Sequence, residues 1–97
     1  MKELTLDDHV VVADAVVSRE LDNETVLLNL DTGIYFGLDP VGANIWRLIV
    51  QHGSLARVLE AMLEEYEVEP QTLERDLLEL CGRLCMNDLG EVISGDS

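Results

Sequence analysis

The hydrophobic pattern of the chain changes its period at Asp39-Pro40, and this change is the strongest constraint on the fold. Before it, apolar and polar residues alternate, as they do along a half-buried β-strand. After it, apolar residues recur every three or four positions, as they do along one face of an α-helix. The sequence therefore predicts strands followed by helices, and so an α+β domain.

Three strands are expected before Asp39, over residues 10–21, 25–30 and 34–38. The first is rich in β-branched residues, and turn-forming residues follow the first and second strands (Asp22-Asn23-Glu24 and Asp31-Thr32-Gly33). The alternation gives each of the other two strands one apolar face: Val26, Leu28 and Leu30 on the second, and Ile34, Phe36 and Leu38 on the third. These segments predict a three-stranded antiparallel meander.

Three helices are expected after Asp39, because capping residues mark their ends. Asp39 is an N-cap with Pro40 at the first helical position, and Gly53 ends this helix. Ser54 caps the second helix, and the third runs from about Pro70 to about Asn87. The expected core stripes are Val41, Ile45, Leu48 and Ile49 with Trp46 on one shoulder, then Leu55, Val58, Leu59, Met62, Leu63 and Tyr66.

Three strands followed by three helices predict a winged helix-turn-helix-like fold. Residues 91–93 can add a short strand, and residues 94–97 are expected to fray. The chain has no internal repeat and no linker, so we predict one domain over residues 1–97 with an ordered core of about 10–93.

The charge of the chain excludes several classes of partner. Twenty acidic residues against six basic ones give a formal net charge of −14. Nucleic acid and anionic membrane surfaces are negatively charged and bind positively charged proteins, so we expect neither as a partner. No signal peptide or run of apolar residues long enough to span a membrane is visible, which predicts a soluble, cytoplasmic protein.

The residue types that usually carry catalysis are not grouped in a recognisable motif. His9 follows two aspartates near the N-terminus, and His52 lies at the end of the first helix, where solvated or capping roles are expected. Cys81 and Cys85 lie four residues apart, with no further Cys or His close in sequence to complete a metal site. Phosphate-binding loops and nucleophile elbows are absent from the sequence. We therefore expect no enzyme activity, no cofactor and no metal.

The third helix has a wider apolar arc than one packing partner needs. Its expected core stripe is Leu73, Leu77, Leu80 and Leu84. Leu78, Cys81 and Cys85 widen the arc to about 160°. This helix either packs against two neighbours or, with Glu74 and Gly82, forms one wall of an open groove. A glycine inside a helix costs about 1 kcal/mol relative to alanine, so Gly82 suggests a packing or functional requirement.

Residues 30–46 (LDTGIYFGLDPVGANIW) resemble the hallmark segment of PqqD-like proteins. These proteins are peptide-recognition domains of pathways that modify ribosomal peptides. The sequence of this segment most resembles that of stand-alone members associated with lasso-peptide biosynthesis. The resemblance covers about residues 16–93. Asp39 stands where the family often has Asn, and either residue can accept a hydrogen bond at an N-cap.

The resemblance implies a non-catalytic protein that binds the leader of a precursor peptide. In the family, the leader adds as a strand to the edge of the third strand, in a cleft closed by the third helix. The implied strand edge is Ile34, Tyr35, Phe36, Gly37 and Leu38. For the wall, the arc of the third helix gives Glu74, Leu78, Cys81 and Cys85, with Arg75 and Gly82 on its rim.

The implied second partner is a maturation enzyme. It is a leader protease working with a cyclase in the lasso case, or a radical SAM enzyme for a PqqD-type chaperone. A winged-helix regulator that binds protein and a small thiol or metal protein are the alternatives. The exposed third strand can also pair between two copies to give a homodimer.

Overall fold

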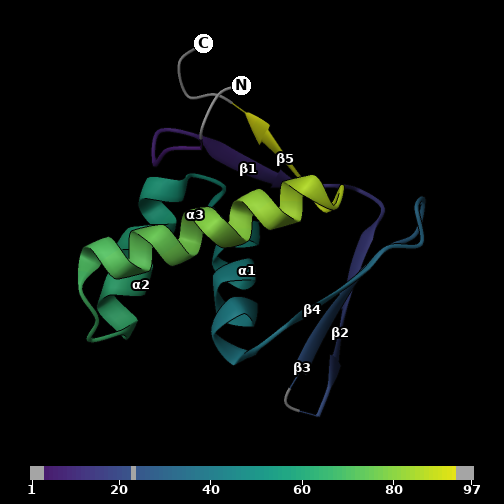
Figure 1. Cartoon of the computed structure of the whole chain (residues 1–97), viewed down its shortest axis with the longest axis horizontal. Helices are drawn as coiled ribbons and strands as arrows, with labels where there is room; N and C mark the ends of the chain where they lie inside the picture. The colour runs from purple at the N-terminus through teal and green to yellow at the C-terminus, as the bar shows by residue number, and fades with distance from the viewer. Residues whose placement is uncertain (1–3, 23, 94–97) are drawn as a thin grey trace.

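The computed structural model describes residues 4–22 and 24–93 (Figure 1). The expectation that residues 94–97 fray lies outside them. In chain order the elements are β1 His9–Val12, β2 Val16–Leu21, β3 Glu24–Asn29, β4 Tyr35–Leu38, α1 Pro40–His52, α2 Leu55–Glu65, α3 Pro70–Met86 and β5 Gly90–Ile93. The helices α1 and α3 lie within about one residue of their predicted bounds, and α2 begins directly after its predicted cap, Ser54.

The described strands form two antiparallel sheets. One is the predicted meander, in the order β2-β3-β4, and the other pairs β1 with β5. Figure 1 shows the β1-β5 pair beside the C-terminal end of α3, and the meander beyond α1. The arrangement is the winged-helix-like α+β fold that the sequence predicted.

The single strand predicted over residues 10–21 is wrong, because the chain turns between Val12 and Val16. The turn is closed by a hydrogen bond from the Val16 N–H to the Ala13 carbonyl at 3.1 Å. β1 then pairs with β5, with Val10 opposite Val92, and β2 pairs with β3. A run of β-branched residues predicts extended chain, but it does not say where the chain changes partner.

The helix ends follow the predicted capping chemistry. The Asp39 side chain accepts a hydrogen bond from the Gly42 N–H at 2.7 Å, directly before Pro40 at the start of α1. The helix ends at Gly53, whose φ of 73° falls in the left-handed region that glycine tolerates. Ser54 caps α2 through the Arg57 N–H. These caps fix where α1 leaves β4.

The core lies among the three helices and one face of the meander. Its members are Val10, Leu27, Leu38, Ile45, Trp46, Leu48, Ile49, Leu55, Val58, Leu59, Met62, Leu73, Leu77, Cys81, Leu84 and Leu89. Four predicted stripe positions differ: Val41 and Leu63 are exposed, and Tyr66 and Leu80 are only half-buried. Trp46, expected on the shoulder, is buried.

The covered face of β3 is the opposite of the predicted apolar face. Leu27 is fully buried and Asn29 is 4% exposed, whereas Leu30 is 63% exposed. Val26 and Leu28 are half-buried on the outer face. Asn29 is buried because its amide makes hydrogen bonds there, so a polar residue occupies a core position that hydrophobicity alone would not give it.

Candidate functional site

The free edge of β4 is the edge of the meander that lies beside α3. Among the described strands, β4 pairs with β3 alone, so one edge of it has no neighbour. The Asn29 N–H donates to the Ile34 carbonyl at 3.0 Å, which makes Asn29 and Ile34 a hydrogen-bonded pair. Hydrogen-bonded and non-hydrogen-bonded pairs alternate along an antiparallel ladder, so Phe36 and Leu38 bond to β3. The N–H and C=O groups of the two residues between them, Tyr35 and Gly37, therefore point to the free edge.

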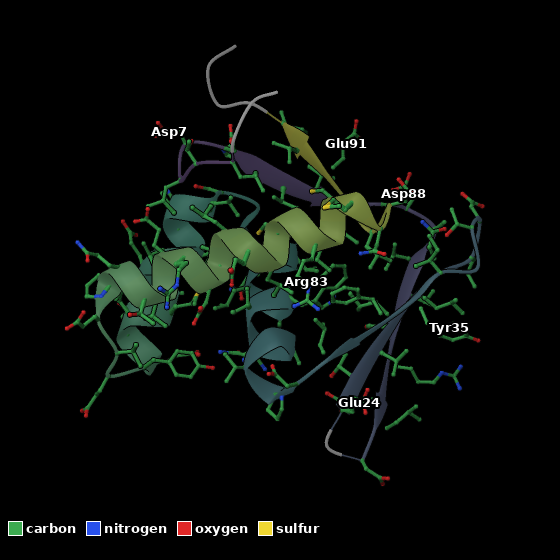
Figure 2. The ribbon with its side chains drawn as sticks, in the orientation of Figure 1. Asp7, Glu24, Tyr35, Arg83, Asp88 and Glu91 are labelled. Atoms are coloured by element: carbon green, nitrogen blue, oxygen red, sulfur yellow. The ribbon has the colours of Figure 1, made fainter. Side chains whose placement is uncertain are left out.

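The side chains of β4 also divide into two sets. Phe36 and Leu38 face the helices, half-buried and buried respectively. Tyr35 is 72% exposed on the outer face, pairing with Leu28. Figure 2 shows Tyr35 directed away from the helices. The five strand residues named from the sequence thus lie on one edge, with alternating faces.

α3 contacts this strand through Arg83. The guanidinium carbon lies 5.3 Å from the centroid of the Phe36 ring, within the range of a cation–π contact (Figure 2). Leu80 and Asp76 precede Arg83 by three and seven residues, so they share its side of the helix. Leu80 is half-buried and Asp76 is exposed. We call Ile34–Leu38 together with Leu80 and Arg83 the edge site.

The wall predicted on α3 lies on the other flank of the helix. Cys81 is completely buried, so it cannot touch a partner. The Cys85 sulfur lies 4.0 Å from the position that a Cβ on Gly90 of β5 would take. Cys85 and Arg83 are about 160° apart around the helix, so the Cys85 flank faces β5 while the Arg83 flank faces β4. The predicted wall stays a prediction, and in the peptide-free protein its residues lie on the flank away from Arg83.

The other predicted α3 residues follow from the same geometry. Glu74 and Leu78 lie on the Cys85 flank, at helical spacing from it. Arg75 and Gly82, predicted for the rim, lie on the side of α3 away from Leu80. A Cβ at Gly82 would have no atom within 4 Å, so no packing contact requires this glycine. The width of an apolar arc is visible in the sequence, whereas the neighbour that each flank meets is set by tertiary packing.

The environment of both cysteines favours the protonated thiol. Burial, and secondarily the neighbouring Cys85, raises the pKa of Cys81 to about 12. Burial raises the pKa of Cys85 as well, with a smaller contribution from Glu91. A thiol must ionise to act as a nucleophile or a metal ligand. In the part of the chain that the structure describes, no group of three or more His, Cys, Asp or Glu residues is placed to hold a metal ion.

Two hollows lie elsewhere on the surface. One of about 780 Å³ is formed between α1 and the β2-β3 hairpin, with Glu20, Asp22 and Glu24 among its lining residues. A second, of about 460 Å³, lies at the end of the same hairpin beside Asp39 and Pro40. Neither is lined by α3; the first contains no residue of the edge site, whereas the second adjoins its C-terminal end through Gly37 and Leu38. None of the helices in the described chain is long and apolar enough to cross a bilayer.

Comparison with known proteins places the chain in a family. The sequence pattern of coenzyme PQQ synthesis protein D (PqqD) matches residues 24–89. A search of curated proteins gave no match. The fold is similar to that of TbiB1, solved in complex with the TbiA(β) leader peptide, at 43% identity and a TM-score of 0.77 over 84% of this chain and 94% of TbiB1.

The fold is also similar to that of a lasso peptide synthetase B1 complexed with its leader peptide. Identity is 28% and the TM-score is 0.76, over 86% of this chain and 98% of the synthetase subunit. The family match includes the meander from β3 onward and all three helices. The chain belongs to the PqqD family.

Proposed function

We propose that this chain is a non-catalytic leader-peptide-binding protein of the lasso-peptide type, which captures a ribosomal precursor by β-strand addition. The observation that carries the proposal is the edge of β4 that pairs with no other described strand. Beside this edge, the guanidinium of Arg83 in α3 packs on the ring of Phe36. Similarity to two B1 proteins that were solved with leader peptides supports the same assignment.

The peptide would pair with the backbone groups that face outward from β4. These are the N–H and C=O of Tyr35 and of Gly37. Side chains of an added strand alternate between the faces of the sheet. Every second leader residue would therefore point to the covered face, where Phe36, Leu80 and Arg83 are in reach.

Backbone pairing alone gives little affinity. Each backbone hydrogen bond contributes about 0.5–1.5 kcal/mol, while ordering the peptide costs about 1–2 kcal/mol per residue. Apolar anchors are therefore required, each contributing about 1.5–3 kcal/mol when buried. The half-buried side chains of Phe36 and Leu80 supply apolar surface for them. A micromolar dissociation constant corresponds to about 8 kcal/mol, so about three to five such anchors are needed when backbone pairing and peptide ordering offset each other.

The strong negative charge of the chain adds a rate effect. A net charge of −14 attracts basic segments over long range and raises the association rate at low salt. The leader that fits this protein would therefore carry Lys or Arg residues near its bound segment. An association rate that does not change with salt would contradict this part of the proposal.

The captured precursor would then pass to a maturation enzyme in the cytoplasm. Similarity to lasso B1 proteins favours a leader protease working with a cyclase over the radical SAM partner of a PqqD-type chaperone. Two copies pairing through β4 would occupy the same edge as the leader, and the charge of −14 on each copy opposes such a dimer.

Isothermal titration with a synthetic leader tests the proposal. The peptide is the leader of the precursor encoded beside the gene for this chain, and a scrambled peptide of the same composition is the control. We expect saturable one-to-one binding with a dissociation constant in the micromolar range or below, and none to the scrambled peptide. Equal binding of both peptides, or of neither, would refute the function.

A further inference from the structure

The buried side chain of Asn29 joins two turns that are far apart in the sequence. Its Oδ1 accepts hydrogen bonds from the N–H groups of Asp31 and Thr32, at 2.8 and 3.1 Å. Its Nδ2 donates to the carbonyl of Asp88 at 2.7 Å. A backbone N–H only donates and a carbonyl only accepts, so these partners fix the orientation of the amide.

The two ends of this side chain do different things. The bonds to Oδ1 close the β3-β4 turn, as an Asx turn does. The bond from Nδ2 is not needed for that turn, because Asp88 lies 59 residues away, just beyond α3. The donor end of Asn29 therefore connects the hairpin to the C-terminal end of α3.

The end of α3 is itself well defined. The Leu89 N–H donates to the Leu84 carbonyl at 2.9 Å, and the Asp88 N–H donates to the Cys85 carbonyl at 3.2 Å, which is the Schellman pattern. Asp88 has a φ of 59°, and Leu89 is completely buried. The Asp88 carbonyl is thus held by a fixed helix end, and moving it would move α3.

This connection lies at one end of the edge site. Asn29 directly precedes the turn into β4, and Asp88 follows Arg83 by five residues. Figure 1 shows α3 and β4 close together at this end and running apart toward the start of α1. Figure 2 shows the Arg83 side chain, which contacts Phe36, between α3 and β4. Asn29 and this stacking contact together hold α3 against the strand.

We propose that Asn29 is a positioning residue for leader binding: its Nδ2–Asp88 hydrogen bond sets the spacing between α3 and the β4 edge that the leader strand must fit. The inference rests on the proposed function, because the spacing matters only if a strand enters there. Asn29 itself is buried and need not touch the peptide.

The test separates the donor of Asn29 from its acceptor. Asn29→Asp keeps an oxygen for the turn and loses the donor to Asp88, and Asn29→Ser keeps a shorter acceptor that cannot reach Asp88. Thr32→Ala is the matched control, because the Thr32 hydroxyl accepts from the Ile34 N–H at 3.2 Å within the same turn and has no bond to α3. Affinity for the fluorescein-labelled synthetic leader is measured by polarisation, on variants shown to be folded by circular dichroism.

We expect Asn29→Asp and Asn29→Ser to weaken leader binding about tenfold, and Thr32→Ala to change it less than twofold. In the peptide-free protein, NMR should show a reduced ring-current shift of the Arg83 side-chain protons in both Asn29 variants. Folded Asn29 variants that bind like the wild type, or a Thr32→Ala variant that loses as much affinity, would overturn the inference. A wild-type protein that binds no leader would instead overturn the proposed function, while the NMR comparison would still test the coupling of Asn29 to α3.

Discussion

A proline at position 35 should block leader binding while leaving the fold in place. The Tyr35 N–H points to the free edge of β4, so replacing it removes a donor that the leader uses and none that β3 uses. The side chain is 72% exposed, so its loss removes little packing. One lost hydrogen bond of about 0.5–1.5 kcal/mol weakens binding about 2- to 12-fold. The proline ring also occupies the position of the donor hydrogen, so we expect a loss of at least about tenfold.

The matched control is a proline at the other edge of the same sheet. The Leu30 N–H donates to the Ala15 carbonyl at 2.9 Å, and alternation along this ladder turns the Ser18 N–H away from β3. Ser18→Pro should therefore carry a similar stability cost without changing leader affinity, and Tyr35→Ala separates the ring of Tyr35 from its backbone. Titration calorimetry gives the affinities, and urea unfolding followed by Trp46 fluorescence gives the stabilities. A folded Tyr35→Pro variant with wild-type affinity, or an equal loss in Ser18→Pro, would refute the reasoning.

Three further changes test the packing. Gly82→Ala should raise the free energy of unfolding by about 1 kcal/mol and leave leader affinity unchanged, since the added Cβ meets no atom and lies on the far side of α3 from Leu80; a loss of stability in urea would contradict this. Leu77→Ala should lower the free energy of unfolding by about 2–5 kcal/mol because Leu77 is completely buried. Leu80→Glu should weaken leader binding more than it lowers stability, because Leu80 is half-buried. Equal destabilisation by both variants would mean that Leu80 is only a core residue. Iodoacetamide at pH 8 should leave Cys81 unmodified until urea unfolds the protein. Only the thiolate reacts, and the pKa of about 12 in the folded protein keeps the Cys81 thiol protonated. Rapid labelling of Cys81 in the folded protein, measured by mass spectrometry, would contradict this by showing that the thiol is accessible.

Local chemistry in the sequence predicted the helices well. Asp39, Pro40, Gly53 and Ser54 act on their nearest neighbours, so their capping roles can be read from the chain alone. The edge strand was also predictable, because the alternation over residues 34–38 fixes which side chains share a face.

Long-range partners were not predictable from the same signals. The first strand divides at Ala13 because its first half pairs with β5, at the other end of the chain. Asn29 can be buried because its side-chain Nδ2 donates to the Asp88 carbonyl, and no local sequence pattern indicates this partner. For α3, the width of the apolar arc was visible in the sequence, whereas the contact of Arg83 with Phe36 depends on tertiary packing.

Amide hydrogen exchange with and without the synthetic leader tests strand addition most directly. If the leader pairs with β4, the amides of Tyr35 and Gly37 should become strongly protected, while those of Ser18 and Glu20 on the opposite edge should exchange as before. Leader binding that leaves the Tyr35 and Gly37 amides unprotected, or that protects the β2 edge instead, would contradict the account.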